Sequence, residues 1–452
     1  MIQAQSSIRG ASRIANLVVC CGLLAAAVMV YYHQGLFLPR ARQSRVSRNL
    51  ARGYSFGNDF YQIWFTTREC LPQRSDPYSE EVTRQIQIGL YGRVLDPNNP
   101  GDPKDRRAFP YPAFVDLLLW PTSQLSFPVA RILVFSILLP LSAAMVWLWM
   151  KALGWFPPWQ WTVLIVALVF TSYPVLEGLY AGQIGLLVGF LLAAAIFALQ
   201  RGSLLLSGIL MALTTIKPQM TALLIVYLLF WSLHDLRTRR RFCVGLFATA
   251  SVLVLAALIV WPHWIGSWMH ILRAYRGYNP PPLLSQVLGA IFGSRLQQPS
   301  YFFCSAVLLA AAMWLGWRNR SAPVGSTEFW LTLSLLLTIT AVVVLSGQAV
   351  YDHIVLLPGI LFLISRWREL SANRIIKALL MIGAIVLFWP WLAACGLVLL
   401  KPILSREQFY SKTVFLLPLY FAVGLPFAVL APLALAVRNL KEIREYTTVA
   451  RS

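Results

Sequence analysis

Long apolar runs recur along the chain and are separated by short polar stretches, which is the pattern of transmembrane helices. Each run is continuous in its hydrophobicity, whereas the strands of a membrane barrel would alternate. The pattern predicts an all-α bundle of about twelve spans, the shortest of which need tilt or local bilayer thinning. The predicted spans are 14–33, 127–150, 159–176, 182–200, 203–216, 219–232, 242–261, 300–317, 327–346, 351–365, 376–399 and 414–437.

The composition is that of an integral membrane protein and excludes an ordinary soluble one. The 452 residues have a mean hydropathy of +0.65, with 58% hydrophobic and 12% charged residues. An average soluble domain is about one quarter charged. Of the 6 cysteines, Cys70 is the one that lies outside the apolar runs. Neither a disulfide framework nor a cysteine-based metal site is therefore expected.

The distribution of basic residues predicts how the chain sits in the membrane. Alternate short connections carry Lys and Arg, and the positive-inside rule places these connections in the cytoplasm. Both termini then lie in the cytoplasm, with 1–33 as a tail and a retained first helix, and 438–452 as a second tail. The segment 34–126 becomes a large first extracytoplasmic loop, and 127–437 holds the remaining spans of one integral membrane domain.

The 34–126 loop has a mixed character. An apolar stretch over 113–120 is too short to cross a membrane, so we expect an interfacial helix there. Arginines gather at the start of the loop: Arg40, Arg42, Arg45, Arg48 and Arg52. They form either a solvated stretch or a basic rim that attracts a lipid phosphate. The net charge of +21 is divided between the two faces of the membrane, which argues against nucleic-acid binding.

Unusual polar residues gather at the predicted outer face. They are Asp59, Asp76, Glu177, Gln183, Lys217, Asp352 and His353. Ionisable groups are costly at the edge of a membrane span, so their concentration at one interface indicates a binding or catalytic site. Asp59, which follows the first span, is the leading candidate for a catalytic group.

Each of these residues also has a structural interpretation. Asp59 is alternatively a solvated loop carboxylate or a helix cap, and Asp76 before Pro77 suits a turn. Glu177 suits the end of a helix at the interface.

The remaining polar residues have similar alternatives. Gln183, at the start of a span, suits a hydrogen bond between helices. Lys217 is placed to extend to the lipid headgroups. Asp352 and His353 suit structural bonds to neighbouring residues.

Short motifs follow one another in a fixed order relative to the spans. They are Asn58-Asp59-Phe60-Tyr61, Asp76-Pro77-Tyr78, Tyr111-Pro112, Gly182-Gln183, Ile216-Lys217-Pro218 and Tyr351-Asp352-His353. This order resembles glycosyltransferase family 87, whose members are multispanning membrane enzymes of the GT-C type. The resemblance covers about residues 55–360. The family pattern often has Tyr-Pro-Pro where this chain has Tyr111-Pro112-Ala113, a departure that affects loop shape rather than chemistry.

The resemblance implies a specific activity and location. It implies an enzyme that takes a sugar from a polyprenyl phosphate donor at the outer face of a bacterial cytoplasmic membrane. Mannose is the implied sugar, since family members of known type resemble α-mannosyltransferases. Asp59 occupies the place of the catalytic carboxylate, in the first outer loop. The implied partners are membrane lipid, the lipid-linked donor and a glycan or glycolipid acceptor, with no cofactor and no required metal.

General chemistry agrees with this assignment. An inverting transfer needs one carboxylate to accept the proton of the acceptor hydroxyl. The leaving group is already a phosphate, so it needs positive charge and hydrogen-bond donors, for which Lys217, His353 and an outer-loop arginine are candidates. The residues predicted to bind substrate are Asp76, Tyr111, Glu177, Gln183, Lys217, Asp352 and His353.

The main alternative function is a secondary transporter or lipid flippase. Many spans, broken helices and ionisable residues at membrane edges suit such a protein as well. The sequence shows no internal repeat, and its polar residues gather at one face instead of the midplane. Both observations favour the enzyme. Within enzymes, a related ligase that moves a preassembled glycan is a second alternative.

Overall fold

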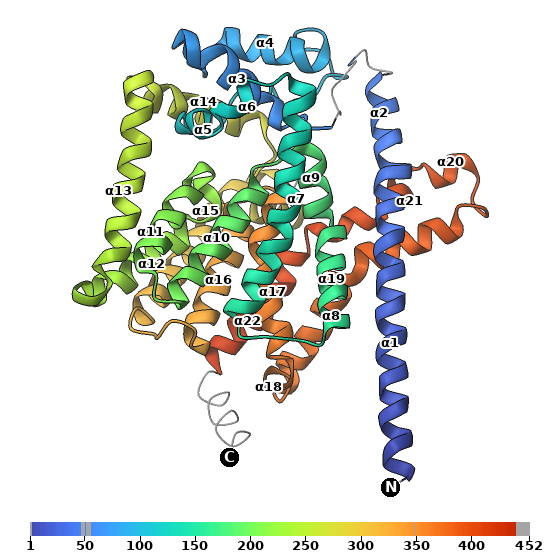
Figure 1. Cartoon of the computed structure of the whole chain (residues 1–452). Helices are drawn as coiled ribbons and strands as arrows, with labels where there is room; N and C mark the ends of the chain where they lie inside the picture. The colour runs from blue at the N-terminus through green and yellow to red at the C-terminus, as the bar shows by residue number, and fades with distance from the viewer. Residues whose placement is uncertain (1, 47–49, 51–55, 348, 440–452) are drawn as a thin grey trace.

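The computed structural model describes residues 2–46, 50, 56–347 and 349–439, and within these ranges the chain is helical. No strand occurs among the described residues, and one isolated antiparallel bridge joins Pro282 to Ser346. Figure 1 shows upright helices covered at one end by shorter ones, with the start of α1 at the other end. The predicted all-α class is confirmed.

Six helices in the described part of the chain are long and apolar enough to cross a membrane. They are Ile14–Ser44, Phe127–Ala152, Leu236–Val260, Leu283–Arg318, Arg374–Leu400 and Leu417–Arg438. The helices α8 (Trp159–Thr171) and α9 (Tyr173–Ala181) meet at a bend of 56° and raise the number to at most 7 if they form one span.

The predicted number of about twelve spans is therefore not confirmed. The other predicted spans correspond to apolar helices shortened by breaks in the chain. These helices are α10 (Gly185–Gln200), α11 (Leu204–Leu213), α12 (Ala222–His234), α16 (Thr327–Val343) and α17 (Leu357–Ser365). The breaks include the 3₁₀ turns η2 (Thr214–Ile216), η3 (Pro218–Met220) and η4 (Val350–Leu356).

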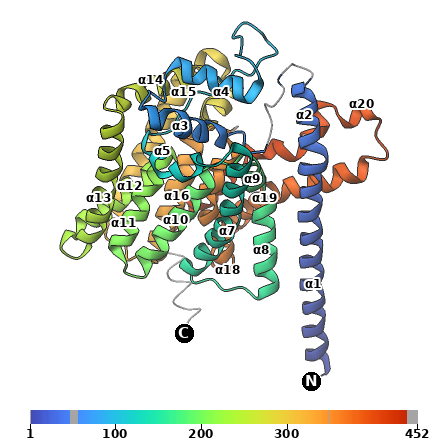
Figure 2. The ribbon, with the colours of Figure 1, turned by 45° about the horizontal axis from the view of Figure 1, so that its top comes forward.

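The first helix extends beyond its predicted end at residue 33. α1 (Ile2–Val30) continues through a π-helical segment, η1 (Tyr31–Phe37), into α2 (Leu38–Val46). Residues 34–46, predicted as loop, are thus helical. Figures 1 and 2 show the α1–α2 rod at one side of the bundle, beside α20 (Arg406–Phe409). α1 packs against α8 and α19 (Arg374–Leu400).

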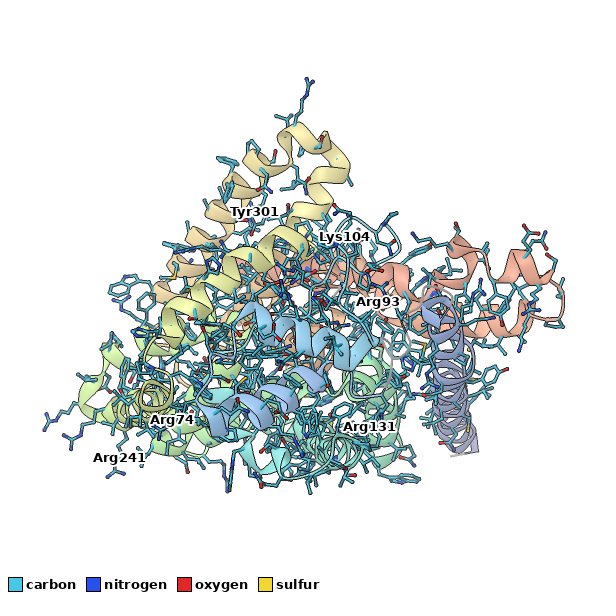
Figure 3. All side chains as sticks on the ribbon, turned by 90° about the horizontal axis from the view of Figure 1, so that it is seen from above. Arg74, Arg93, Lys104, Arg131, Arg241 and Tyr301 are labelled. Carbon is cyan, nitrogen blue, oxygen red and sulfur yellow. The ribbon has the colours of Figure 1, made fainter. Side chains whose placement is uncertain are left out.

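Short helices cover the end of the bundle that lies opposite the start of α1 (Figure 1). This outer layer consists of α3 (Phe60–Gln73), α4 (Glu80–Tyr91), α5 (Phe114–Leu118), α6 (Trp120–Ser123) and α14 (Trp264–Tyr278). Figure 3 looks down on α3 and α4 as they lie across the upright helices. The interfacial stretch predicted at 113–120 falls in two short helices, because the backbone departs from helical geometry at Leu119.

The other elements complete the bundle. They are α7 (Phe127–Ala152), α13 (Leu236–Val260), α15 (Leu283–Arg318), α18 (Trp367–Leu370), α21 (Lys412–Phe415), η5 (Leu417–Ala422) and α22 (Leu425–Arg438). The main hydrophobic core runs through both the bundle and the outer layer. The outer layer is therefore packed onto the bundle as part of the same core.

Asp116 joins α5 to α3 inside the outer layer. Thr66 Oγ1 and Thr67 Oγ1 lie 2.9 and 3.0 Å from its Oδ1, while its Oδ2 has no hydrogen-bond partner among the described residues. Burial raises the pKa of this carboxyl to about 8, against the opposing effect of the two hydroxyls. Each threonine hydroxyl also lies within hydrogen-bonding distance of the Ile63 carbonyl, but it has only one hydrogen to donate. A protonated Asp116 carboxyl supplies one more hydrogen to this cluster of acceptors.

We expect Asp116→Asn to flatten the pH dependence of the free energy of unfolding. The folded protein keeps this proton up to about pH 8, whereas an unfolded aspartate loses it near pH ~3.9. The folded state binds more protons in this window. The contribution of Asp116 to stability is therefore complete below the window and is lost as pH rises through it, by at most about 1.4 kcal/mol per pH unit.

Denaturant unfolding in detergent at several pH values across this window measures the slope. The matched control is Glu407→Gln, which changes an exposed carboxyl on α20 and should keep the wild-type slope. An Asp116→Asn slope equal to that of wild type would contradict the buried neutral carboxyl.

Candidate active site

A network of hydrogen-bonded polar side chains joins the outer layer to the bundle. Arg107 Nη1 donates to Asp59 Oδ1 at 2.6 Å, and Gln183 Nε2 donates to Asp59 Oδ2 at 2.5 Å. Lys217 Nζ donates to Gln183 Oε1 at 2.9 Å and to Asp352 Oδ1 at 2.7 Å. We call Arg107, Asp59, Gln183, Lys217 and Asp352 the polar network. Four of the predicted site residues therefore meet in space.

Backbone contacts hold Asp59 in place between α9 and the loop before α3. Gly57 N donates to Tyr180 O at 2.8 Å, and Asp59 N donates to Ala181 O at 3.0 Å. The last carbonyls of a helix lack partners within it, and this loop supplies them for α9. Asp59 occupies the N-cap position of α3, but its carboxylate makes no capping bond. The helix-cap interpretation of Asp59 is therefore wrong.

The junction depends on two glycines with left-handed backbones. Gly57 has a φ of +79° and Gly182 a φ of +69°, conformations that residues with a Cβ rarely adopt. A Cβ on Gly182 would also lie 2.9 Å from the Cβ of Phe60. Gly182 ends α9 as a left-handed C-cap, and the next residue, Gln183, bonds Asp59.

Lys217 enters the network because the chain breaks between α11 and α12. The turns η2 and η3 flank Lys217, and Pro218 cannot donate a backbone hydrogen bond. Thr214 Oγ1 and Thr221 Oγ1 lie 2.9 Å apart across the break. Lys217 is only 5% exposed and pairs with Asp352, so it does not extend to the lipid headgroups.

The neighbours of Gln183 determine which way its amide faces. A lysine ammonium can only donate and a carboxylate can only accept, so Oε1 faces Lys217 and Nε2 faces Asp59. Asp59 Oδ1 accepts a second bond, at 3.0 Å, from Asn58 Nδ2, while Oδ2 accepts the bond from Gln183. Each carboxylate oxygen has two lone pairs, so Oδ2 retains one for a further donor.

Aromatic residues surround the ammonium group of Lys217. Its Nζ lies 5.0 Å from the ring centroid of Tyr351 and 5.9 Å from that of Tyr111. The backbone beside the Tyr111 ring is anchored, since Tyr78 donates to the Tyr111 carbonyl and Trp268 to the Pro110 carbonyl. Burial, with the nearby Asp59 carboxylate, holds the pKa of the Tyr111 phenol well above its ordinary value. Tyr111 thus presents a neutral hydroxyl at the network.

Two predicted site residues, Asp76 and Glu177, contact residues outside the polar network. Asp76 Oδ1 accepts from Tyr78 N, and its Oδ2 accepts from Ser267 Oγ, both at 2.9 Å. Asp76 therefore forms a turn and links it to α14. Glu177 Oε2 lies 3.2 Å from Nε2 of His33, a fully buried residue in η1.

His353 has different surroundings from its neighbour Asp352. It lines an apolar cavity of about 300 Å³ between α8, α9, η4, α17 and α19, together with residues such as Leu168, Leu361 and Trp391. Neither ring nitrogen makes a hydrogen bond within the described residues, although the backbone of Ser346 lies nearby. The structure therefore separates His353 from the ion pair of Asp352 with Lys217.

Arg107 is the network residue that the sequence located only as an outer-loop arginine. Its backbone has a φ of +60°, which is uncommon for a residue other than glycine. Its Nε donates to Tyr91 Oη at 3.0 Å and lies 3.4 Å from Asp105 Oδ2. The available sequence signal was its position just before the Tyr111-Pro112 motif. Tyr351, the first residue of the Tyr351-Asp352-His353 motif, is a further site residue that the sequence does not single out.

No metal-binding group is evident in the part of the chain that the structure describes. There, no three His, Cys, Asp or Glu side chains lie close enough together to hold a metal ion. The six cysteines, Cys70 included, have free thiols. The expectation that the reaction requires no metal stays a prediction.

Gly185 leaves the space in which the ion pair of Lys217 with Asp352 fits. A Cβ on Gly185 would lie 2.6 Å from Asp352 Oδ1 and 3.4 Å from Lys217 Nζ. We expect Gly185→Ala to lower the free energy of unfolding by about 1–3 kcal/mol, because the Asp352 carboxylate must move from its partner.

Unfolding in detergent measures this change. The control is Gly396→Ala in the interior of α19, where an added Cβ meets nothing within 4 Å. That variant should be neutral or slightly more stable, because alanine favours the helix. Equal losses in both variants would argue against the tight fit at Gly185.

Comparison with known proteins supports a family assignment. A family model described as glycosyltransferase family 87 matches residues 109–347, more than half of the chain. The matched segment contains Tyr111, Gln183 and Lys217, while Asp59 and Asp352 lie outside it. Neither a curated protein nor a solved structure matches the chain. The chain therefore belongs to glycosyltransferase family 87 and is a membrane glycosyltransferase.

Proposed function

We propose that the protein transfers a sugar from a polyprenyl phosphate donor to an acceptor hydroxyl, with inversion at the anomeric carbon and with Asp59 as general base. The observation that carries this proposal is the environment of the Asp59 carboxylate. Oδ1 accepts bonds from Arg107 and Asn58, whereas Oδ2 accepts one bond and retains a lone pair. The side chain is 13% exposed, so the group is held firmly yet remains accessible.

The proposed reaction is a single displacement. The acceptor oxygen bonds to the anomeric carbon as the bond from that carbon to the phosphate oxygen breaks. The acceptor proton passes to Asp59 Oδ2, and the lipid phosphate leaves with the electron pair of the broken bond. One carboxylate suffices, because no covalent sugar–enzyme intermediate forms. Gln183 and Arg107 act as positioning residues that fix the orientation of the carboxylate.

The leaving phosphate needs positive charge and hydrogen-bond donors. Lys217 is the nearest candidate within the network, although its charge is already balanced by Asp352. The neutral Tyr111 hydroxyl lies beside it. In this proposal Lys217 therefore orients Gln183, and the positive charge for the phosphate is assigned to an outer-loop arginine.

Three finer points of the proposal rest on the sequence. The network connects to the outer layer, opposite the start of α1, and the positive-inside rule assigns that end to the outside of a bacterial cytoplasmic membrane (Figure 1). Mannose is the sugar that the family resemblance implies. The acceptor is a glycan or glycolipid. The family assignment gives no support to the transporter alternative.

We expect Asp59→Asn to slow transfer by about 10²–10⁴-fold, because the amide cannot accept the acceptor proton. Purified protein is given polyprenyl phosphate mannose and a bacterial glycolipid extract, and mass spectrometry follows the products. The control, Asp235→Asn, alters an N-cap on α13 where asparagine also caps well, and should keep wild-type activity. Wild-type transfer by Asp59→Asn would remove this residue as the base.

We expect Gln183→Glu to lower kcat by about tenfold or more, with little change in the donor KM, because it sets a second carboxylate against Asp59. Steady-state kinetics with the same donor measures both constants. The control is Gln408→Glu in the capping box of α20, a position that accepts either residue. A large rise in KM at unchanged kcat would instead assign Gln183 to ground-state binding of the donor.

A further inference from the structure

A groove runs between the α1–α2 rod and the α7–α9 part of the bundle. It has a volume of about 490 Å³, within the usual range of ligand sites. Its walls are mainly apolar: Val30, Phe135, Leu139, Phe170, Leu176 and Leu179. Figures 1 and 2 show α7, α8 and α9 as the part of the bundle that faces the rod.

One end of the groove is polar and positively charged. Arg42 on α2 and Gln34 in η1 line it together with Tyr180. Arg42 Nη2 donates to Tyr180 Oη at 2.9 Å. Arg131 lies 5.8 Å from the ring of Phe56, another lining residue, and its buried Nε has no hydrogen-bond partner among the described residues.

The cations at this end lack the acidic partners that the polar network has. Arg107 pairs with Asp59 and Lys217 with Asp352. By contrast, neither Arg42 nor Arg131 lies within 4.0 Å of a carboxylate in the described ranges of the chain. An unbalanced guanidinium at the head of an apolar groove suits an anionic headgroup with a hydrocarbon tail, and phosphate is one of the anions whose geometry matches the guanidinium fork.

The charged end of the groove lies directly behind the catalytic turn. Phe56 precedes Gly57, whose amide donates to the carbonyl of Tyr180, itself a groove residue. The next carbonyl, of Ala181, accepts from Asp59 N. A lipid bound here therefore has its headgroup against the turn that carries Asp59, whereas a lipid that only surrounds the protein needs no such position.

We infer that this groove holds the lipid carrier of the donor, with its phosphate at Arg42 and Tyr180 and its isoprenoid chain between Phe135, Leu139 and Leu176. The inference rests on the proposed function, because it assigns the occupant as the polyprenyl phosphate of that reaction. Of the sequence-predicted basic rim, Arg42 is the member in the groove. Arg48 and Arg52 lie outside the described residues, as does the side chain of Arg45.

Kinetics of matched variants tests the two ends of the groove. Arg42→Gln should raise the donor KM about tenfold, the expected loss for one charge-assisted hydrogen bond, and Arg42→Lys should recover part of it. Arg40→Gln, on the same helix but beside the ring of Tyr410, should leave the KM unchanged. Leu139→Trp should fill the groove and raise the KM, whereas Ile137→Trp, on an exposed part of α7, should not.

Binding is tested directly with a polyprenyl phosphate that carries a photoreactive diazirine in its chain. In the full-length protein we expect labelled peptides around Phe135, Leu139 and Leu176. Unlabelled polyprenyl phosphate should compete, whereas phosphatidylglycerol and inorganic phosphate should not. Labelling elsewhere, or equal competition by phosphatidylglycerol, would overturn the inference.

Labelling does not depend on turnover, so the two proposals fail separately. Groove labelling in a protein whose Asp59→Asn variant still transfers sugar would leave this inference standing and remove the proposed base. Loss of transfer in Asp59→Asn with labelling outside the groove would keep Asp59 as the proposed base and overturn the inference about the groove. Equal KM values for Arg42→Gln and Arg40→Gln would also count against the groove.

Discussion

Opposite charges buried between apolar helices must be paired, and this constraint organises the site. Removing one member of a buried ion pair leaves the other uncompensated, which typically costs about 3–5 kcal/mol. Here Lys217 pairs with Asp352, Gln183 connects the lysine to Asp59, and Arg107 balances Asp59. The outer layer, the turn between α9 and α10, the break before α12 and η4 must therefore come together for the network to form.

The broken helices are the structural means by which the network is built. Irregular backbone at membrane depth is tolerated where protein covers it. The chain breaks at Gly182, around Lys217 and through η4, and each break brings a network residue to the junction. The shortness of the flanking helices, which keeps the number of full-length spans below the predicted one, follows from the same breaks.

Asp59 lies between two regions of different character. On one side are the paired charges of Lys217 and Asp352, with the phenols of Tyr111 and Tyr351. On the other side, beyond Gly57 and the end of α9, lies the apolar groove with Arg42 at its head. This arrangement suits the proposed reaction, in which a sugar leaves a lipid phosphate, because the turn that carries Asp59 borders the groove as well as the polar network.

The sequence by itself determined the class of the protein and the principal candidate residues. Apolar run length is a local property, so the positions of the apolar helices, the short stretch at 113–120 and the gap between spans at Lys217-Pro218 are predictable, whereas the number of helices that cross the membrane is not. The motif order alone singles out Asp59, Gln183, Lys217 and Asp352 as candidates. Only the tertiary structure decided which candidates meet, because Gln183 bonds Asp59 across 124 residues and Lys217 bonds Asp352 across 135.

The tertiary structure also decided features that no local pattern encodes. Asp76, Glu177 and His353 looked equivalent to the network residues in the sequence, yet each has other surroundings. The role of Arg107 depends on a left-handed backbone and on contacts far along the chain. Hydrophobic patterning sets where a helix crosses the membrane, but the direction of each polar side chain depends on how the helices break and pack, and that is a property of the whole bundle.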